Sequence, residues 1–313
     1  MLRALVADLA ILNGYEVVVT VDHRLPADEL PAGVEAVVVS ERREAQEAFA
    51  AAVERADGTC VIAPELDDEL ARRCEAVEAL GGRLLGAPAA AIRRAADKLL
   101  LPALLASAGV PALDTVPIQW EAERHSHARV RVIKPRFGAG STDIYVTSSE
   151  ATLPGRPETE REWVSTRFEP GLAASVLTLV GPQEVVALRA GRQFLSTDGR
   201  LRYLGGELPL EPHLEKRALH LARRAVRAIP GLRGFIGVDL VLSSADTNGS
   251  ADRVVEINAR LTTSYVGLRA LARDNLASAW LRVLDGVPCG ELRWSSRRIS
   301  FQPETLPELV EQP

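Results

Sequence analysis

Two apolar, β-branched segments near the C-terminus, joined by turn-forming residues, constrain the fold of this chain most. Residues 234–242 read Gly-Phe-Ile-Gly-Val-Asp-Leu-Val-Leu, and residues 253–260 read Arg-Val-Val-Glu-Ile-Asn-Ala-Arg. The segment between them contains only Ser, Ala, Asp, Thr, Asn and Gly, most of which favour turns. Because both segments have the composition of strands, the pattern predicts an antiparallel hairpin.

This hairpin gathers acidic and amide side chains on one face. Alternate side chains of a strand point to opposite faces, so Glu256, Asn258 and Arg260 share one face while Val255 lies on the other. Asp239 of the first strand can then lie opposite Glu256 and Asn258. Two carboxylates and an amide oxygen suit one or two Mg²⁺ ions, with Mn²⁺ as the alternative. We therefore predict a metal site here, although solvated carboxylates on an exposed sheet face would give the same pattern.

A glycine-rich turn lies upstream, in residues 131–146, which read as strand, turn and strand with Lys134 at the end of the first strand. Small residues let backbone N–H groups close around phosphate oxygens, and a lysine adds a mobile positive charge. The segment has neither the Walker A pattern nor the dinucleotide fingerprint. We predict a phosphate-binding loop, and an ordinary hairpin is the alternative. The loop residues are Gly138, Ala139, Gly140, Ser141 and Thr142.

Lysine usage singles out two residues. The chain has 37 lysines and arginines together, of which only Lys98, Lys134 and Lys216 are lysines. Because arginine serves wherever a general positive charge is enough, a lysine is expected where a compact, flexible ammonium is needed. Lys216 lies in an amphipathic helix predicted over residues 213–229 and is expected at the surface. Lys98 and Lys134 are the candidates for binding phosphate.

Four separated motifs together resemble the ATP-grasp superfamily. In chain order they are Ala-Asp-Lys98-Leu, Lys134-Pro135 before the glycine-rich turn, Gly-Val-Asp239-Leu, and Val-Glu256-Ile-Asn258-Ala-Arg260. The resemblance covers about residues 85–286. Within the superfamily, residues 203–209 (Tyr-Leu-Gly-Gly-Glu-Leu-Pro) and 256–265 resemble the branch that contains tyramine–glutamate ligases. Related proteins of this branch serve archaeal-type one-carbon cofactor pathways.

The resemblance implies an α/β fold, with α+β character in the ATP-grasp part. Strands predicted at residues 16–22, 36–40 and 59–63 alternate with helices, which favours a parallel α/β lobe. The expected lobes are a pre-ATP-grasp lobe (1–95), a central lobe with the phosphate loop (96–160) and a C-terminal lobe with the metal site (161–313), the last two clamping ATP. Branch members usually begin with a strand and a glycine-rich loop, whereas this sequence starts at the helix that follows them.

The resemblance also implies an ATP site. Lys98 and Lys134 would hold the phosphates, and residues 138–142 would close over them. A hinge segment, residues 166–169, would hold the adenine edge and the ribose. Thr166 stands where the family usually has an acid, so Glu169 is the remaining ribose candidate. The four hinge residues are Thr166, Arg167, Phe168 and Glu169.

Other polar residues are candidates for substrate binding. Arg260 and the hydroxyl residues Thr262, Thr263 and Ser264 follow the metal motif and could cradle a transferred phosphoryl group and a substrate carboxylate. Capping of a helix predicted over residues 266–285 is the alternative for the hydroxyls. Glu65, after the third strand, could hold a substrate amine or be an ordinary strand-end residue. We expect Arg260 and Lys134 to act in catalysis.

Composition excludes several classes of function. A formal net charge of −5 gives no broad electrostatic footprint for nucleic acid. Three cysteines without C-x-x-C spacing suit a reduced compartment, and the apolar N-terminus carries Arg3 and Asp8 and no cleavage site. We therefore expect a cytoplasmic protein that binds neither nucleic acid nor membrane. The scattered histidines, including His125 and His127, build no site.

From the resemblance we expect an ATP-dependent carboxylate–amine ligase that forms an amide bond through an acyl phosphate. The branch implies that glutamate or a similar small acid is added to an amine or cofactor precursor in methanofuran- or tetrahydromethanopterin-type cofactor biosynthesis. No general base is evident. An ATP-grasp kinase and a non-catalytic nucleotide-binding regulator are the alternatives, and only an amide product separates the ligase from the kinase. The oligomeric state stays open, although homodimers are common among similar enzymes.

Overall fold

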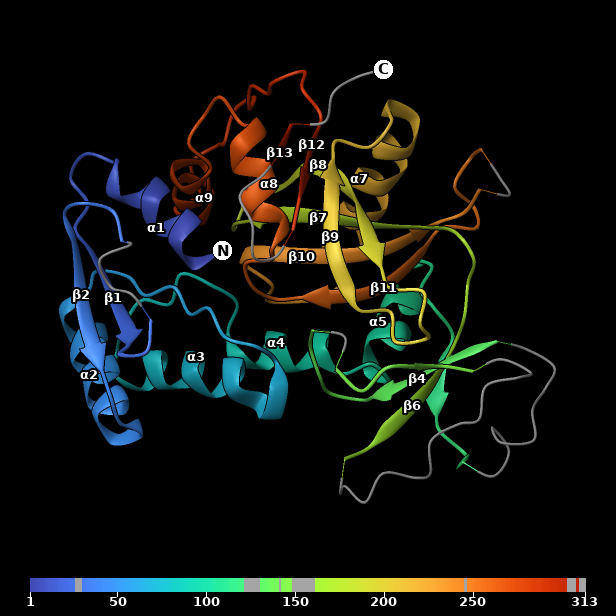
Figure 1. Ribbon diagram of the computed structural model, residues 1–313, viewed down its shortest axis with the longest axis horizontal. Coiled ribbons are helices and arrows are strands. Elements are labelled where there is room, and N and C mark those ends of the chain that lie inside the picture. The colour runs from blue at the N-terminus through green and yellow to red at the C-terminus, as the bar shows by residue number, and fades with distance from the viewer. Residues whose placement is uncertain are drawn as a thin grey trace.

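A computed structural model of the chain describes residues 1–25, 30–120, 130–140, 142–147, 161–244, 247–302 and 308–309. Within them the chain forms a two-stranded, a four-stranded and a seven-stranded sheet (Figure 1). Helices pack on both faces of the seven-stranded sheet and against the two-stranded sheet. None of the described helices is both long and apolar enough to cross a membrane.

The N-terminal part, blue in Figure 1, is built around the small parallel sheet. Its elements are α1 (Leu2–Ala10), β1 (Val17–Asp22), β2 (Val34–Val39), α2 (Arg42–Arg55), the single-turn helix η2 (Leu66–Asp68) and α3 (Glu69–Ala79). Val17 pairs with Val34 and Asp22 with Val39, in parallel register. The strand predicted at residues 59–63 is wrong. Only Thr59 pairs there, in an isolated parallel bridge to Leu84. Residues 60–63 form no strand, because no neighbouring strand among the described residues pairs with their backbone.

Two helices and a small antiparallel sheet follow. The helices are α4 (Ala89–Ala96) and α5 (Leu100–Ser107), and the strands are β3 (Thr115–Pro117), β4 (Arg131–Pro135), β5 (Tyr145–Val146) and β6 (Trp163–Arg167). The strand order is β3-β6-β4-β5. Val132 pairs with Val146, so the glycine-rich turn joins two antiparallel strands as predicted. β6 lies in this sheet, although the lobe boundary that we expect at residue 160 assigns it to the C-terminal lobe.

The largest sheet carries the predicted hairpin. Its strands are β7 (Leu172–Val180), β8 (Val185–Leu195), β9 (Tyr203–Leu208), β10 (Gly234–Leu242), β11 (Arg253–Asn258), β12 (Ile299–Phe301) and β13 (Glu308–Leu309), in the order β11-β10-β7-β8-β9-β12-β13. The helices of this part are α7 (Pro212–Arg227), α8 (Ser264–Leu271) and α9 (Leu276–Leu284). β10 and β11 pair in antiparallel register, as the sequence predicts.

Both faces of this sheet are buried. On β7, Val176 packs into the core that α7 and α4 cover, whereas Leu177 packs into the core that α8, α9 and α1 cover. Ile236 and Phe235 divide between the same two cores on β10. This alternation is the strand periodicity that the sequence shows, and it fixes the register because a shift by one residue would exchange the two faces.

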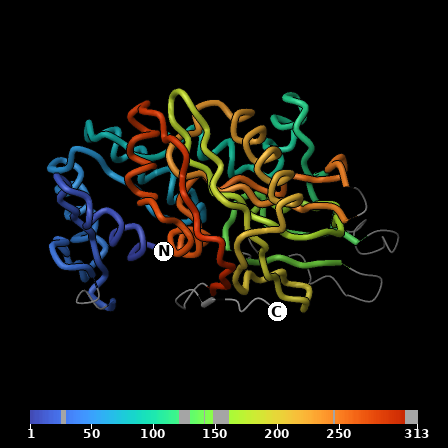
Figure 2. Tube along the Cα trace, turned by 90° about the horizontal axis from the view of Figure 1, so that it is seen from above, coloured from blue at the N-terminus to red at the C-terminus, as the bar shows by residue number. Residues whose placement is uncertain are grey.

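The helix predicted over residues 266–285 is wrong, because the chain forms two helices there. α8 ends before Ala272, and α9 begins after Asn275, whose side chain accepts a hydrogen bond from the Ser278 N–H at 2.9 Å. A side-chain N-cap of this kind starts a new helix. In Figures 1 and 2, α1 lies beside α9. Buried Asp8 of α1 accepts a hydrogen bond from the Tyr265 hydroxyl at 2.6 Å and ties α1 to α8.

The tip of the β8–β9 connection contacts the four-stranded sheet. The Val146 N–H of β5 donates to the carbonyl of Gly199 at 2.9 Å. The Arg200 guanidinium lies over the Tyr145 ring, 4.1 Å from its centroid, which is close enough for a cation–π interaction. We call these two interactions the tip contact. They join the four-stranded sheet to the seven-stranded sheet.

Candidate active site

A cavity of about 350 Å³ lies between the four-stranded and seven-stranded sheets. We call it the central cavity. Strands β4, β8, β10 and β11, the β6–β7 connection and the segment before α8 all contribute to its wall. It contains most of the predicted site residues, namely Lys134, Gly140, Thr166, Arg167, Phe168, Glu169, Asp239, Glu256, Asn258, Arg260, Thr262, Thr263 and Ser264. Segments far apart in the sequence therefore meet in one place.

The predicted acidic cluster lies in this cavity. Asp239 pairs directly with Glu256 across the β10–β11 hairpin, and Asn258 lies opposite Gly237. The Asn258 amide donates to Asp239 Oδ2 at 3.0 Å, and the Gln193 amide donates to Asp239 Oδ1 at 2.9 Å. Our sequence analysis missed Gln193, because an isolated glutamine on a strand carries no motif signal. Two amides thus position a carboxylate without neutralising its charge.

The pKa values of the two carboxyl groups are shifted in opposite directions. Burial and the adjacent Glu256 raise the pKa of Asp239. Burial would also raise the pKa of Glu256, but Lys134 and Lys98 hold that pKa below its ordinary value. Closely spaced carboxylates titrate as a pair, since both cannot be ionised at low cost without a nearby positive charge.

These residues fit a divalent cation. A divalent cation between Asp239 and Glu256 would offset the repulsion between the two carboxylates that raises the pKa of Asp239. Asn258 uses its amide nitrogen toward Asp239, so its amide oxygen stays available as a ligand. The described residues contain no group of three or more His, Cys, Asp and Glu arranged to hold a metal. The set is a carboxylate pair with an amide, which suits an ion that keeps several waters.

A β-bulge corrects one detail of the predicted hairpin. The register shifts between Asp239 and Leu240, so that Leu240 faces Val254 and Val255 is the extra residue. Strict alternation predicts that Val255 faces the core, but because of the bulge it lines the central cavity. A bulge adds one residue to one strand and turns the following side chains by one position.

The lysines occupy three different environments. Lys134 is buried on β4 and lines the central cavity. Lys98 is also buried, and its Nζ donates to the carbonyl of Gly138 at 3.0 Å, so it binds the glycine-rich turn from behind. Burial lowers the pKa of Lys98 to about 8. Lys216 is exposed on α7, as predicted.

The structure brings only part of the glycine-rich turn to the cavity. Gly140 lines it with φ +70°, a left-handed conformation that favours glycine. Gly138, Ala139 and Thr142 are described but lie outside the cavity wall. Ser141, which our prediction includes in the loop, is outside the described residues. The predicted closing of the turn over phosphates stays a prediction.

The expected hinge segment lines the cavity where β6 ends. The Thr166 hydroxyl is buried and lies 3.1 Å from the Thr115 hydroxyl, within hydrogen-bond distance. Arg167 Nε lies 3.0 Å from Glu169 Oε1 in an ion pair. Glu169 therefore has an arginine partner but remains at the cavity wall, where a ribose hydroxyl could reach it.

Arg260 and the hydroxyl residues form another part of the wall. Arg260 Nε donates to Glu65 Oε2 at 2.8 Å, which joins segments distant in the sequence. The Thr262 and Ser264 hydroxyls lie 2.8 Å apart. Thr263 is the N-cap residue of α8, but its side chain makes no capping hydrogen bond. A Cβ at Gly237 would lie 2.4 Å from Thr262 Cγ2, so this glycine leaves room for the threonine.

Comparison with protein families gives two matches. A family model described as an ATP-grasp domain matches residues 95–264, and one described as a pre ATP-grasp 3 domain matches residues 15–92. The first includes every predicted site residue except Glu65. The boundary between the matches, at residues 93–94, lies within α4.

Two curated relatives are about a quarter identical to this chain over the aligned residues. The tyramine–L-glutamate ligase of Methanocaldococcus jannaschii is 26% identical over 216 residues, which are 69% of this chain and 59% of that protein. The enzyme of the same name from Methanocaldococcus fervens is 25% identical over 217 residues, which are 69% of this chain and 62% of that protein. The chain thus spans about three fifths of the length of these relatives.

Solved structures share the fold at lower identity. An ATP-grasp superfamily protein from Archaeoglobus fulgidus has a TM-score of 0.65 and 22% identity, covering 90% of this chain and 87% of that one. The L-amino acid ligase of Bacillus licheniformis has a TM-score of 0.72 and 19% identity, covering 95% and 76%. N5-carboxyaminoimidazole ribonucleotide synthetase from Thermus thermophilus has a TM-score of 0.71 and 19% identity, covering 95% and 79%.

Proposed function

The chain belongs to the ATP-grasp family, since the ATP-grasp domain model matches more than half of it, and from this premise we propose that it is an ATP-dependent carboxylate–amine ligase. The family and the mixed α/β fold that the sequence predicts are confirmed. The observation that carries the proposal is the meeting of Lys134, the Asp239–Glu256 pair and Arg260 in one cavity. This set combines the charges that phosphoryl transfer to a carboxylate requires.

ATP occupies the central cavity in this proposal. The adenine edge and ribose lie along residues 166–169, with Glu169 toward the ribose, and the phosphates extend toward Lys134. Lys98 supports the glycine-rich turn through its hydrogen bond to the Gly138 carbonyl and adds positive charge close to Glu256. Backbone N–H groups of residues 138–142 would close over the phosphates, and of these residues Gly140 already lines the cavity.

A divalent cation, Mg²⁺ or Mn²⁺, would be held by Asp239, Glu256 and Asn258. Bound there, it would neutralise negative charge on the phosphates. Gln193 and Asn258 hold the carboxylate of Asp239 in place through their amides. This positioning costs little reorganisation when substrate binds, because the hydrogen bonds already exist.

The reaction needs little covalent chemistry from the protein. The substrate carboxylate attacks the γ-phosphorus, ADP leaves, and an acyl phosphate results. The amine then attacks in its neutral form and forms a C–N bond to the acyl carbon, while the C–O bond to phosphate breaks and phosphate leaves with the bonding electrons. The surplus N–H proton passes to the departing phosphate or to water. Arg260 stabilises charge on the acyl and phosphoryl oxygens, and the hydroxyls of Thr262, Thr263 and Ser264 position these groups.

The names of the relatives extend the proposal to substrate classes. Two relatives are tyramine–L-glutamate ligases, and a protein of similar fold is an L-amino acid ligase. We accordingly propose glutamate or a similar small acid as the carboxylate, joined to an amine or cofactor precursor. Methanofuran-type or tetrahydromethanopterin-type cofactor biosynthesis is the proposed setting, and a homodimer is the proposed assembly.

The test incubates the full chain with Mg²⁺-ATP, single amino acids and a panel of primary amines and pterin precursors. ADP release is followed, and products are identified by mass spectrometry. A product one water lighter than acid plus amine supports the ligase, and omission of either substrate should abolish it. ADP with a phosphorylated acceptor and no amide would make the protein a kinase, whereas nucleotide binding without turnover on any acceptor would make it a regulator.

A further inference from the structure

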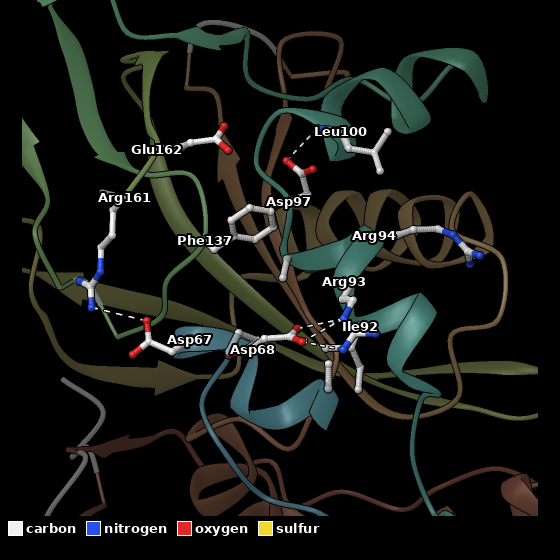
Figure 3. A pocket seen from close by; sticks show the side chains of 13 residues that line it. Asp67, Asp68, Ile92, Arg93, Arg94, Asp97, Leu100, Phe137, Arg161 and Glu162 are labelled. Carbon is white, nitrogen blue, oxygen red and sulfur yellow. Dashed lines mark hydrogen bonds and ion pairs between the residues drawn. The ribbon is translucent and has the colours of Figure 1, made fainter. Parts of the chain in front are cut away.

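A second cavity, of about 520 Å³, lies where the N-terminal part meets the four-stranded sheet. We call it the junction cavity. Its wall comes from η2 and α3 on one side, α4 and the start of α5 on another, and the turn after β4 (Figure 3). Phe137 of that turn stands between the labelled residues of the other elements in Figure 3. The sequence predicts one residue of its wall, Glu65, as a candidate for binding a substrate amine, but it predicts no cavity there.

Glu65 joins the junction cavity to the central cavity. It lines the junction cavity, and its Oε2 accepts the hydrogen bond from Arg260, which lines the central cavity. Glu65 is 93% buried, since its exposed fraction is 7%. Its other oxygen, Oε1, is buried without a hydrogen-bond partner among the residues that the structure describes. A buried carboxylate oxygen of this kind is costly unless a donor reaches it.

Most other acids of the wall already have arginine partners. Asp68 lies 2.6 Å from Arg93 and Asp97 lies 2.6 Å from Arg136, measured between the charged oxygen and nitrogen atoms. Glu162 shares Arg136 at 2.7 Å. These pairs neutralise the charges of the three acids, so the acceptor that still lacks a donor is Glu65 Oε1.

Two further basic residues do not satisfy Glu65. In Figure 3, Arg94 points away from Phe137, and its guanidinium donates to the Pro230 carbonyl at 3.1 Å. Lys98 is close enough to interact electrostatically with Glu65, but its Nζ donates to the Gly138 carbonyl. A ligand that supplies an N–H donor to Glu65 Oε1 would complete this part of the structure.

The remaining wall is apolar. Ala71, Ile92, Leu100 and Phe137 line the cavity, and Leu100 and Phe137 are 40% and 44% exposed. Side chains of this kind bind an aromatic or aliphatic body through the area they remove from water. A polar group at one end and an apolar wall along the rest are typical of a small-molecule site.

We propose that the junction cavity binds the amine substrate, with its cationic head on Glu65 Oε1 and an aromatic or aliphatic body along Leu100 and Phe137. This rests on the proposed ligase function and names the class of amine, a primary amine with an apolar body. A carboxylate ligand is excluded from the same position because Glu65 repels it. The shared carboxylate places the amine next to Arg260, at the side of the central cavity where the acyl phosphate forms.

The first experiment measures binding to the full chain without nucleotide, by titration calorimetry at pH 7. The probes are 2-phenylethylamine, the neutral 2-phenylethanol and the anionic 3-phenylpropionate. The amine should bind about tenfold or more tightly than the alcohol, because a charge-assisted hydrogen bond to a buried carboxylate is lost in the alcohol. The anion should bind most weakly. Equal binding of amine and alcohol, or no binding of the amine, would overturn the proposal.

Variants locate the bound amine. Glu65→Gln keeps an oxygen for Arg260 but removes the charge, so it should abolish the preference for amine over alcohol. Leu100→Ser leaves the Glu65–Arg260 pair intact and should weaken both probes by about three- to fivefold through lost apolar contact. Leu80→Ser is the matched control, because Leu80 is 39% exposed and lies outside the cavity. A preference retained in Glu65→Gln, or binding unaffected by Leu100→Ser, would place the amine elsewhere.

Turnover separates this inference from the proposed function. If amide forms but Leu100→Ser changes the KM for ATP or acid and not for amine, the junction cavity is not the amine site while the ligase stands. If the amine binds as expected but only ADP or a phosphorylated acceptor forms, the ligase falls and the cavity remains a cation-binding site. The two failures therefore give different patterns.

Discussion

The central and junction cavities both contain buried or half-buried carboxylates, but the carboxylates have different partners. In the junction cavity, Asp68 and Asp97 each pair with an arginine. In the central cavity, Asp239 is held by the neutral amides of Gln193 and Asn258. An arginine that binds both oxygens of a carboxylate, as at Asp68 and Asp97, cancels its charge, whereas an amide fixes the carboxylate and leaves the charge for a ligand. Glu65 is intermediate, because Arg260 occupies only its Oε2. The comparison separates acids that build a wall from acids that remain available for chemistry.

The strongest test of this comparison removes the carboxylates held ready in the central cavity. Asp239→Ala and Glu256→Ala should each lower the rate of ADP release by about 100-fold or more, because preorganised charge at the reacting phosphoryl group is lost. Nucleotide binding, measured by calorimetry, should be partly retained. The control is Asp274→Ala, whose carboxylate pairs with Arg293 outside both cavities. Unchanged ADP release in both cavity variants would remove these residues from catalysis.

A second test concerns the pair that joins the cavities. Arg260→Met leaves Glu65 buried without its arginine and should lower the free energy of unfolding by about 3 kcal/mol, as for other broken buried pairs. The double variant Glu65→Leu/Arg260→Met removes both charges and should recover much of this loss. Urea unfolding of the two single variants and the double variant gives the coupling energy. An additive result would mean that the two side chains contribute independently.

A smaller effect is expected where the hairpin meets the hydroxyl segment. Gly237→Ala places a Cβ 2.4 Å from Thr262 Cγ2 and should cost about 1–3 kcal/mol in unfolding free energy. Thr262→Ser removes that methyl group but keeps the hydroxyl, so Gly237→Ala/Thr262→Ser should regain stability. Thermal unfolding measures both. Failure of the serine to restore stability would show that the close approach to this methyl group is not the cause.

The smallest effect is expected for an arginine-paired acid of the junction cavity. Burial opposes ionisation of Asp97, but Arg136 and two backbone N–H groups hold the pKa of Asp97 below its usual value. The folded state then binds fewer protons than the unfolded state, so this stabilisation is present above about pH 4 and is lost as the pH falls through the folded pKa.

Asp97→Asn keeps an oxygen for the N–H groups of Leu99 and Leu100 and removes the charge. It should lower the unfolding free energy at pH 7 by about 1 kcal/mol and flatten the dependence on pH below 4. Urea unfolding between pH 2 and pH 7 tests this expectation. If the unfolding free energy of the variant depended on pH below 4 as it does in the unchanged protein, Asp97 would not be the source of this dependence.

Local patterns predict the parts of the fold that local sequence determines. The β10–β11 hairpin follows from β-branched residues and a polar turn, and the pairing of Asp239 with Glu256 follows from alternation. The bulge at Val255 could not be predicted, because inserting one residue into a ladder depends on its neighbours. The break between α8 and α9 has a local signal in Asn275, which continuous apolar periodicity obscures.

The limits for the site are of a different kind. Lys134, Arg260 and the carboxylates could be predicted because each belongs to a motif, and the motifs follow one another in a characteristic order. Gln193 contacts Asp239 across the sheet, and nothing near it in the sequence marks that contact. The junction cavity likewise depends on how α3, α4 and the turn after β4 pack together, which no single segment specifies. The roles assigned to the site residues stay predictions.

The tip contact bears on the kinetics of nucleotide exchange. Any movement that separates β5 from the β8–β9 connection must break the Val146–Gly199 hydrogen bond and the Arg200–Tyr145 interaction. If both persist with nucleotide bound, their strength enters the barriers for entry and exit alike and cancels in the dissociation constant. The residence time of the nucleotide would then depend on residues that do not affect its affinity. A substitution of Tyr145 would accelerate nucleotide release without weakening nucleotide binding.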